Sequence, residues 1–303
     1  MSELTLRQLE YAVAVADEGH FGRAAEVALV SQPGLSAQVR ELERSLGVAL
    51  FERTSRGTRT TPAGDALIGR ARQVLLAVAD LQREAQLHRE GLRGTIRVAA
   101  IPTMAPYLLP TLVRVLHTCW PHVQLQLLEL QTSRLVEATE DGSVDIGLLA
   151  TPVDTGSLHV QTMCKEDFVL ALPRRHPLAK GEPLALSVLR DLPVLLMEDG
   201  HCLHEHAQAA CALAGQPEVT VVRSAGLSTL AQMVVAGAGV TLLPESAVPV
   251  EARSGSGLVV RRFEPPAPGR TVSLAWRGSD PRREPFAAAA ADVARAFSPS
   301  VAE

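Results

Sequence analysis

Residues 30–47 read VSQPGLSAQVRELERSLG, and this stretch contains the signals of one complete helix. Ser31 is a favoured helix N-cap, and the fixed backbone of Pro33 suits a first helical turn. Four apolar residues then recur at helical spacing: Leu35, Val39, Leu42 and Leu46. Gly47 follows as a favoured residue just beyond a helix end. We therefore predict an amphipathic helix that buries its apolar stripe and turns its other side chains outward.

Two shorter helical patterns precede this helix, over residues 6–16 and 21–28. Two helices joined by a tight turn, with the second one capped, form a helix-turn-helix. In such a motif the N-terminal part of the second helix places polar side chains at base edges in the major groove of DNA. The residues that we expect there are Ser31, Gln32, Pro33, Ser36, Gln38 and Arg40.

The segment after this helix suggests a small two-stranded wing, over residues 50–53 and 58–61. Its arginines, Arg53, Arg56 and Arg59, are candidate contacts to phosphate groups. Residues 1–62 contain seven arginines and eight acidic residues, so the charge of the whole segment gives little support for DNA binding. Residues 53–60 contain three arginines and no acid, which makes a local basic patch. The pattern alone leaves a three-helix protein-interaction module open as the alternative.

A long periodic helix is predicted over residues 63–90. Its apolar face is too long for a lone exposed linker, so we expect it to pair with the same helix of a second subunit. The resulting dimer would match a DNA site with two-fold symmetry.

The periodicity changes at residue 95. Strand patterns at 95–100, 123–128 and 144–149 alternate with helical patterns at 107–118 and 133–141, which is typical of a parallel sheet. A second α/β unit begins near residue 168, and the chain returns to the first through a strand at 270–277 and a helix at 284–297. We predict subdomain I from residues 95–166 and 270–303, and subdomain II from residues 167–269, with a ligand cleft between them.

Two of the four cysteines, Cys202 and Cys211, lie nine residues apart in a predicted helix over residues 201–214. Nine residues span about 13.5 Å along a helix axis, whereas a disulfide needs Cα atoms within about 7 Å. These two thiols therefore bond only if the helix unwinds. We interpret Cys119 and Cys164 as small buried hydrophobic residues.

The composition is ordinary for a soluble globular protein, with 47% hydrophobic and 20% charged residues. No apolar run reaches the roughly 18 residues that a membrane span requires, and the first residues do not resemble a signal peptide. Four cysteines without a regular pairing pattern favour a reducing, cytoplasmic location.

The chain resembles LysR-type transcriptional regulators over almost its whole length. The matching positions in the N-terminal part are Ser31-Gln32-Pro33, Leu35-Ser36, Leu42-Glu43, Leu46-Gly47, Phe51-Glu52-Arg53 and Thr61-Pro62-Ala63-Gly64. The segments at 101–110, 198–203 and 236–244, with Cys211, resemble the OxyR family of hydrogen peroxide sensors. The implied fold is a mostly α winged helix-turn-helix and a long linker helix, followed by two Rossmann-like subdomains similar to periplasmic binding proteins.

The resemblance also implies a function. It implies a homodimer or homotetramer that binds double-stranded promoter DNA and interacts with RNA polymerase. It also implies a response to hydrogen peroxide in which a reversible disulfide forms between Cys202 and Cys211. Cys202 would attack the peroxide, and Cys211 would resolve the resulting sulfenic acid. The other residues expected at the site are Thr103, Thr132, Asp199, His201, His204 and Arg277.

Within that set, Thr103 would hold the peroxide through its hydroxyl, and Arg277 would lower the pKa of the Cys202 thiol. His204 stands where the family commonly has arginine, so a group that titrates near neutral pH replaces a permanent cation.

Three other interpretations of the sequence stay open. A regulator of the same fold could bind a small organic ligand in the cleft and use no thiol chemistry. A thiol peroxidase is a second alternative, although we expect a stoichiometric sensor and no enzyme. The cluster of His201, His204 and His206 with Cys202 is a third, but we expect no metal and no cofactor.

Overall fold

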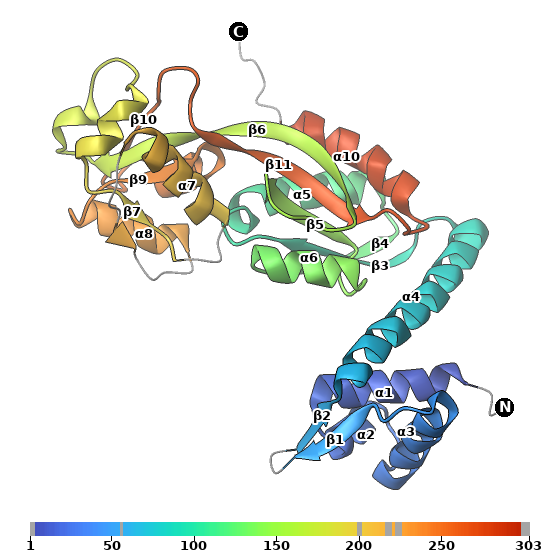
Figure 1. Ribbon diagram of the computed structural model, residues 1–303. Helices are drawn as coiled ribbons and strands as arrows, with labels where there is room; N and C mark the ends of the chain where they lie inside the picture. Colours follow the sequence, from blue (N-terminus) through green and yellow to red (C-terminus); the bar gives the residue numbers. More distant parts are fainter. Residues whose placement is uncertain (1–3, 55–56, 199–201, 216–219, 222–225, 298–303) are drawn as a thin grey trace. The chain divides into compact units, whose positions relative to one another are not determined.

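The computed structural model describes residues 4–54, 57–198, 202–215, 220–221 and 226–297. The chain divides into two compact units, Met1–Gln86 and Leu87–Glu303 (Figure 1). The elements of the first unit are α1 (Leu6–Glu18), α2 (Phe21–Val27), α3 (Gln32–Leu46), β1 (Phe51–Thr54), β2 (Gly57–Thr60) and α4 (Pro62–Glu90), whose last residues cross into the second unit.

The first unit is the predicted winged helix-turn-helix. The hydroxyl of Ser31 caps α3 by accepting a 3.3 Å hydrogen bond from the backbone N–H of Gly34, and Gly47 ends the helix with a left-handed backbone. α3 buries its apolar stripe against α1 and α2. β1 and β2 form an antiparallel hairpin in which Phe51 is opposite Thr60. Residues of α4 complete the core, since Ile68 and Ala71 pack with Leu42 and Leu50 of the preceding elements.

The second unit contains most of the chain. Its helices are α5 (Ala105–Cys119), α6 (Thr132–Glu140), α7 (Cys202–Leu213), α8 (Leu227–Val235), α9 (Val248–Glu251) and α10 (Arg283–Phe297), with short 3₁₀ turns η1 (Pro177–Ala179), η2 (Leu186–Asp191) and η3 (Glu245–Ala247). Its strands are β3 (Gly94–Ala100), β4 (Val123–Glu129), β5 (Ile146–Thr151), β6 (Leu158–Pro173), β7 (Leu195–Leu196), β8 (Thr220–Val221), β9 (Thr241–Pro244), β10 (Leu258–Arg261) and β11 (Gly269–Arg277).

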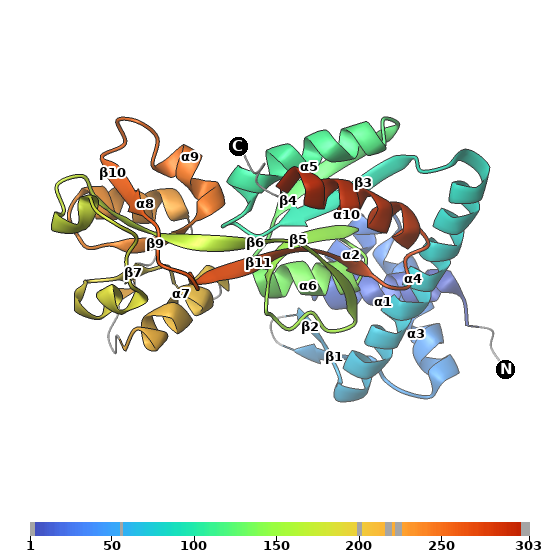
Figure 2. The ribbon, with the colours of Figure 1, turned by 90° about the horizontal axis from the view of Figure 1, so that it is seen from above.

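The main sheet has the order β10-β6-β11-β5-β3-β4, with β9 also paired to β6. β3 is parallel to β4 and β5, as the alternating pattern predicts. The sheet as a whole is mixed, because β11, whose direction the sequence pattern did not indicate, runs antiparallel to both β5 and β6. Figure 2 shows α5 and α10 on one face of this sheet and α6 on the other. β11 therefore runs in the opposite direction to its two neighbours. This direction determines where Arg270 and Arg277 lie along the sheet.

β6 is the strand that joins the two halves of this unit. Its first part pairs with β11, and its second part pairs with β9 and β10. The sequence pattern places the start of this strand at Phe168, whereas it begins ten residues earlier, at Leu158. Hydrophobic side chains form one core around β3, β5 and β11 and a second around β7, α7 and α8. The continuous strand β6 therefore contributes residues to both hydrophobic cores.

None of the described helices is long and apolar enough to cross a membrane.

Candidate functional site

The two cysteines of interest lie at opposite ends of α7, and both are free thiols. Cys202 is the first residue of the helix and packs in the core around β3 and β11, with only 4% of its surface exposed. Cys211 is in the last turn of the helix and packs in the other core. Because both cysteines lie in one α-helix, their Cα atoms are separated by about 13.5 Å along the helix axis. The two thiols cannot bond in this conformation.

A buried arginine cluster lies beside Cys202. Arg270, on β11, donates from Nε to Oε2 of Glu166 on β6 at 2.7 Å. It also donates from Nη1 to the hydroxyl of Thr103 at 2.9 Å and from Nη2 to the carbonyl of Thr103 at 3.2 Å. The other oxygen of Glu166, Oε1, accepts a hydrogen bond from the backbone N–H of Ser246 at 2.8 Å. Two segments therefore hold the guanidinium in one orientation, and a third segment fixes the carboxylate of Glu166.

The environment of Cys202 acts on its thiol in two directions. Burial raises the pKa of Cys202, and this effect outweighs the opposing ones. Arg270 and the hydroxyls of Thr132 and Thr103 lower that pKa, and Glu205 raises it further. Charges and donors that stabilise a thiolate are thus in place, but in this conformation the sulfur is held as the neutral thiol. The net effect is thus opposite to the lowered pKa that the family resemblance implies.

Arg277 is not part of this cluster, and the expectation that it activates Cys202 is corrected by the structure. It lies seven residues after Arg270 on β11, about 23 Å along the strand. There its Nη2 pairs with Oδ2 of Asp280 at 3.3 Å, and its Nη1 donates to the hydroxyl of Ser279. The register of the sheet explains the difference, because Arg270 is directly opposite Glu166 whereas Arg277 is opposite Leu158.

The remaining expected residues divide into two groups. Thr103 and Thr132 lie at the cluster, Thr103 before α5 and Thr132 as the first residue of α6. His204 is buried, and its Nδ1 is 2.6 Å from the carbonyl oxygen of Met197, on the segment before α7. Asp199 and His201 lie outside the described residues.

Three residues of this cluster were missed by the sequence reasoning: Glu166, His206 and Arg270. Arg270 and Glu166 could have been recognised as a pair of opposite charges on neighbouring strands. This pairing can be identified only once the antiparallel register of β11 and β6 is known. His206 had been weighed only as a metal ligand. Among the described residues no group of three or more His, Cys, Asp or Glu side chains is placed to hold a metal ion.

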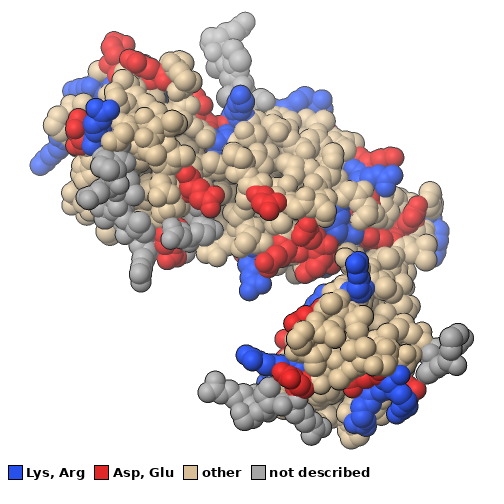
Figure 3. Space-filling view, in the orientation of Figure 1, with Lys and Arg blue, Asp and Glu red and all other residues tan. Residues whose placement is uncertain are grey.

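The residues expected to face DNA lie on the outer side of the first unit. Gln32, Gln38 and Arg40 of α3 are exposed, and Nη1 of Arg40 donates to the hydroxyl of Ser36 at 2.7 Å. Ser31 and Pro33 are exposed at the N-terminus of the same helix. Figure 3 shows basic side chains gathered at the edge of this unit where α3 lies. These residues form one polar surface at a helix N-terminus.

The hairpin contributes the basic residues of the wing. Arg59 is exposed on β2, and Arg53 is on β1 opposite Thr58. Arg56 lies outside the described residues.

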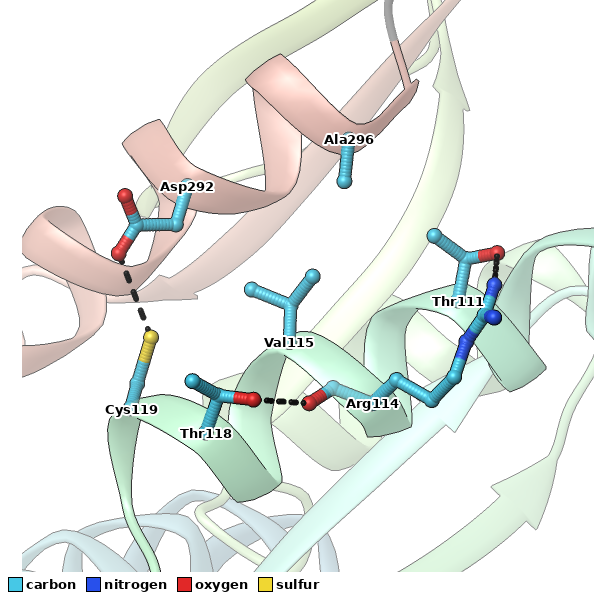
Figure 4. Close-up of a pocket in the computed structure, with 7 residues that line it drawn as sticks. All are labelled: Thr111, Arg114, Val115, Thr118, Cys119, Asp292 and Ala296. Atoms are coloured by element: carbon cyan, nitrogen blue, oxygen red, sulfur yellow. Dashed lines mark hydrogen bonds between the residues drawn. The ribbon is translucent and has the colours of Figure 1, made fainter.

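A surface pocket of about 620 Å³ lies between α5 and α10, away from the Cys202 cluster (Figure 4). Cys119 lines it, and its thiol donates to Oδ2 of Asp292 at 3.3 Å. Burial, together with this carboxylate, raises the pKa of Cys119. Burial and the charge of Glu166 raise the pKa of Cys164 to about 11. Both thiols are therefore poor nucleophiles at neutral pH. They are only partly buried, which corrects the interpretation of both as buried hydrophobic residues.

Comparison with known proteins gives a consistent result in both units. Residues 6–65 match the bacterial regulatory helix-turn-helix proteins of the lysR family, and residues 89–298 match the LysR substrate binding domain. A probable hydrogen peroxide-inducible genes activator of Streptomyces viridosporus is 42% identical over 294 residues, which cover 97% of this chain and 94% of the relative. The DNA-binding transcriptional dual regulator OxyR of Escherichia coli is 40% identical over 283 residues, covering 93% and 92%.

Solved structures agree with these relatives. A full-length OxyR from Pseudomonas aeruginosa that carries a cysteine-to-aspartate substitution has a TM-score of 0.80 at 36% identity, covering 97% of this chain and 96% of that one. A cysteine-to-serine variant of Corynebacterium glutamicum OxyR with bound hydrogen peroxide has a TM-score of 0.64 at 35% identity, covering 97% and 93%.

Proposed function

The chain belongs to the OxyR group of the LysR family of transcriptional regulators, and we propose that it regulates transcription in response to hydrogen peroxide through a reversible disulfide between Cys202 and Cys211. The observation that carries this proposal is the buried Cys202 thiol beside donors from three other elements, Thr103, Thr132 and Arg270. Such donors stabilise a thiolate and bind the oxygen atoms of a small polar oxidant.

The chemistry proceeds in two balanced steps. The thiolate of Cys202 attacks one oxygen of hydrogen peroxide, the S–O bond forms while the O–O bond breaks, and the leaving hydroxide takes up a proton to become water. The sulfenic acid then reacts with the thiol of Cys211, which forms the S–S bond and releases a second water. A dithiol reductant reverses the bond by thiol–disulfide exchange.

The second step requires α7 to unwind, because the regular helix keeps the two cysteines too far apart. Unwinding removes buried residues of α7, such as Leu203, Ala207 and Ala210, from their present packing against β7 and α8. The disulfide therefore changes the surface of the second unit. We propose that this change alters the spacing of two DNA-binding units in a homodimer or homotetramer.

We further propose how the second unit is divided, with residues 95–166 and 270–303 as one subdomain and residues 167–269 as the other. Cys202 then belongs to the second subdomain while its thiol packs among residues of the first. This supports the idea that oxidation changes the contact between subdomains.

The remaining parts of the proposal concern partners and place of action. Promoter DNA would contact the exposed face of α3 and the arginines of the hairpin. RNA polymerase is the expected downstream partner, and the cytoplasm is the expected location, since free cysteines persist in a reducing compartment. The sensor would react once per reduction cycle and would not act as a turnover enzyme.

An organic effector has less support. The pocket beside Glu166 and Cys164 is about 180 Å³, whereas sites for small organic molecules are usually about 300 Å³ or larger. The pocket of about 620 Å³ exceeds this size but is lined by α5 and α10, away from the Cys202 cluster.

Footprinting on promoter DNA tests the proposal. The protected region should differ between reduced and peroxide-treated protein, and Cys202→Ser and Cys211→Ser should each give one footprint regardless of peroxide. Cys164→Ser is the matched control and should respond like the unchanged chain. A peroxide response that survives Cys202→Ser would contradict the proposed sensor.

A further inference from the structure

We propose that His206 is the proton acceptor that ionises Cys202 during its reaction with peroxide, a role that rests on the proposed function of Cys202 as the sensing thiol. Neither the family resemblance nor the sequence pattern assigned a proton-transfer role to this histidine. Three features of the described structure carry the inference: the position of the ring, its unpartnered nitrogen atom, and the charges around it.

The position of His206 brings its ring to Cys202. The two residues are four apart on α7, so their side chains lie on the same face with Cβ atoms about 5–6 Å apart. Side chains on a helix lean toward its N-terminus, which directs the imidazole back to Cys202. The ring lies against the backbone of Cys202. On another side it is bounded by the ring of Phe168, at 6.4 Å between centroids.

One ring nitrogen of His206 is closed off from solvent. Within the described part of the chain, Nδ1 of His206 and the hydroxyl oxygen of Thr132 are buried and have no hydrogen-bond partner of normal geometry. A buried polar atom without a partner costs about 1–3 kcal/mol. Thr132 acts on the Cys202 thiol, and His206 contacts the backbone of Cys202 from one turn further along α7. They are therefore free to bond with a molecule that reacts there.

The charges around His206 keep its ring neutral. Burial lowers the pKa of His206, and Arg270 on β11 lowers it further. Glu205 and the backbone of Cys202, both on α7, act in the opposite direction but do not outweigh these effects. Glu166 on β6 is already bound to Arg270. At neutral pH the imidazole is thus a base, whereas Cys202 is held as a thiol by burial. Ionisation of the thiol needs a base, and among the described residues His206 supplies a neutral imidazole one helical turn from Cys202.

With His206 as the base, every proton in the reaction of Cys202 with hydrogen peroxide is accounted for. Cys202 transfers its thiol proton to Nδ1 of His206, which gives a thiolate and an imidazolium. The thiolate attacks one peroxide oxygen, the S–O bond forms and the O–O bond breaks. The imidazolium then returns the proton to the leaving hydroxide, which departs as water. His206 ends neutral, and Cys202 ends as a sulfenic acid.

The test is the rate at which full-length protein loses the Cys202 thiol to hydrogen peroxide, measured by alkylation and mass spectrometry across a pH series. For His206→Gln we expect the rate at about pH 7 to fall about 10²-fold, the lower range for a lost general base. The difference should narrow toward about pH 10, where hydroxide ionises the thiol directly. His117→Gln, an exposed histidine on α5, is the matched control and should react at the original rate.

A second variant separates proton transfer from structure. Free imidazole should restore part of the rate in His206→Ala, because only a base is missing there, and thermal unfolding checks that both variants fold. A rate loss of the same size at every pH without rescue, or no loss at all, would overturn the role of His206. A failure of the unchanged chain to react would instead overturn the proposed function, so the two outcomes are distinguishable. If His206→Gln does not fold, His206→Asn gives the same readout.

Discussion

Two clusters of buried arginine lie at the two ends of β11, and they differ in how their charge is compensated. At one end Arg282 pairs with both Asp145 and Asp280 at 2.7 Å, and Arg97 and Arg277 pair with the same carboxylates. At the other end, within the described residues, Arg270 pairs with one carboxylate, that of Glu166.

The other described neighbours of Arg270 include a threonine hydroxyl, a threonine carbonyl and a thiol. Buried charge by itself therefore does not mark a functional site. The cluster with incomplete partners and an adjacent nucleophile does, whereas the cluster of matched ion pairs has the composition of a structural element.

The largest effect on stability should come from Asp145→Asn. It leaves Arg97 and Arg282 without their shared carboxylate, and removing one partner of a buried ion pair costs about 3–5 kcal/mol. The free energy of unfolding in urea should fall by that amount, while the peroxide reaction of Cys202 keeps its rate. Asp191→Asn, at an exposed position, is the control for stability. A large loss of rate in the folded Asp145→Asn variant would break the distinction between the two clusters.

The next effect concerns rate and compares the two ends of one strand. In Arg270→Lys a single ammonium replaces a fork that binds Glu166 and Thr103 together, so the pKa of Cys202 should rise further. One pKa unit corresponds to about a tenfold lower thiolate fraction, and we expect about a tenfold slower reaction with peroxide. Arg277→Lys makes the same change at the other end and should leave the rate unchanged. Equal slowing in both variants would restore Arg277 as a site residue.

Thr132→Val should give a smaller loss of rate, about fivefold, because it removes one donor to the thiolate and the oxidant. Its hydroxyl oxygen is buried without a partner in the described structure, so the free energy of unfolding should stay the same or rise. The matched change on the same helix is Thr139→Val, whose hydroxyl donates to the carbonyl of Leu135 at 2.7 Å. That variant should keep the original rate. Stopped-flow oxidation and urea unfolding of both variants give the four values needed.

Two buried groups in different parts of the second unit, Asp145 and Cys211, predict opposite pH limits of stability. Burial raises the pKa of Asp145, but Arg282 and Arg97 outweigh it and hold the pKa below the ordinary value. Its stabilising contribution is therefore present above the unfolded pKa of about 4 and is lost as the pH falls through the folded pKa.

Burial raises the pKa of Cys211 to about 11. Its contribution is therefore present below the unfolded value of about 8.5 and is lost as the pH rises through the folded value. In urea unfolding under reducing conditions, Cys211→Ala should flatten the alkaline decline and leave the acid decline unchanged. An unchanged alkaline slope would contradict the burial effect on this thiol.

Much of the fold followed from local patterns in the sequence. The caps at Ser31 and Gly47 and the apolar stripe between them predicted α3 closely, and the β-α-β alternation predicted β3 to β5. The first part of β6 was missed because its residues between Leu158 and Asp167 alternate irregularly between buried and exposed positions. Register and strand direction depend on long-range pairing, which no local pattern reports.

The site was predictable only in part for the same reason. Cys202, Thr103 and Thr132 were identified through family motifs, and the structure places these three residues around one thiol. The choice between Arg270 and Arg277 required the pairing of β11 with β6, since both arginines lie on the same strand and both are buried. His206 required knowledge of which polar atoms have no partner.

The most direct test of the central claim is a thiol count with mass mapping before and after one equivalent of hydrogen peroxide, under native conditions. The account predicts loss of two thiols, one new bridge that joins Cys202 to Cys211, free thiols at Cys119 and Cys164, and reversal by dithiothreitol. Free thiols at Cys202 and Cys211 after excess peroxide would contradict it, and so would a bridge to any other cysteine.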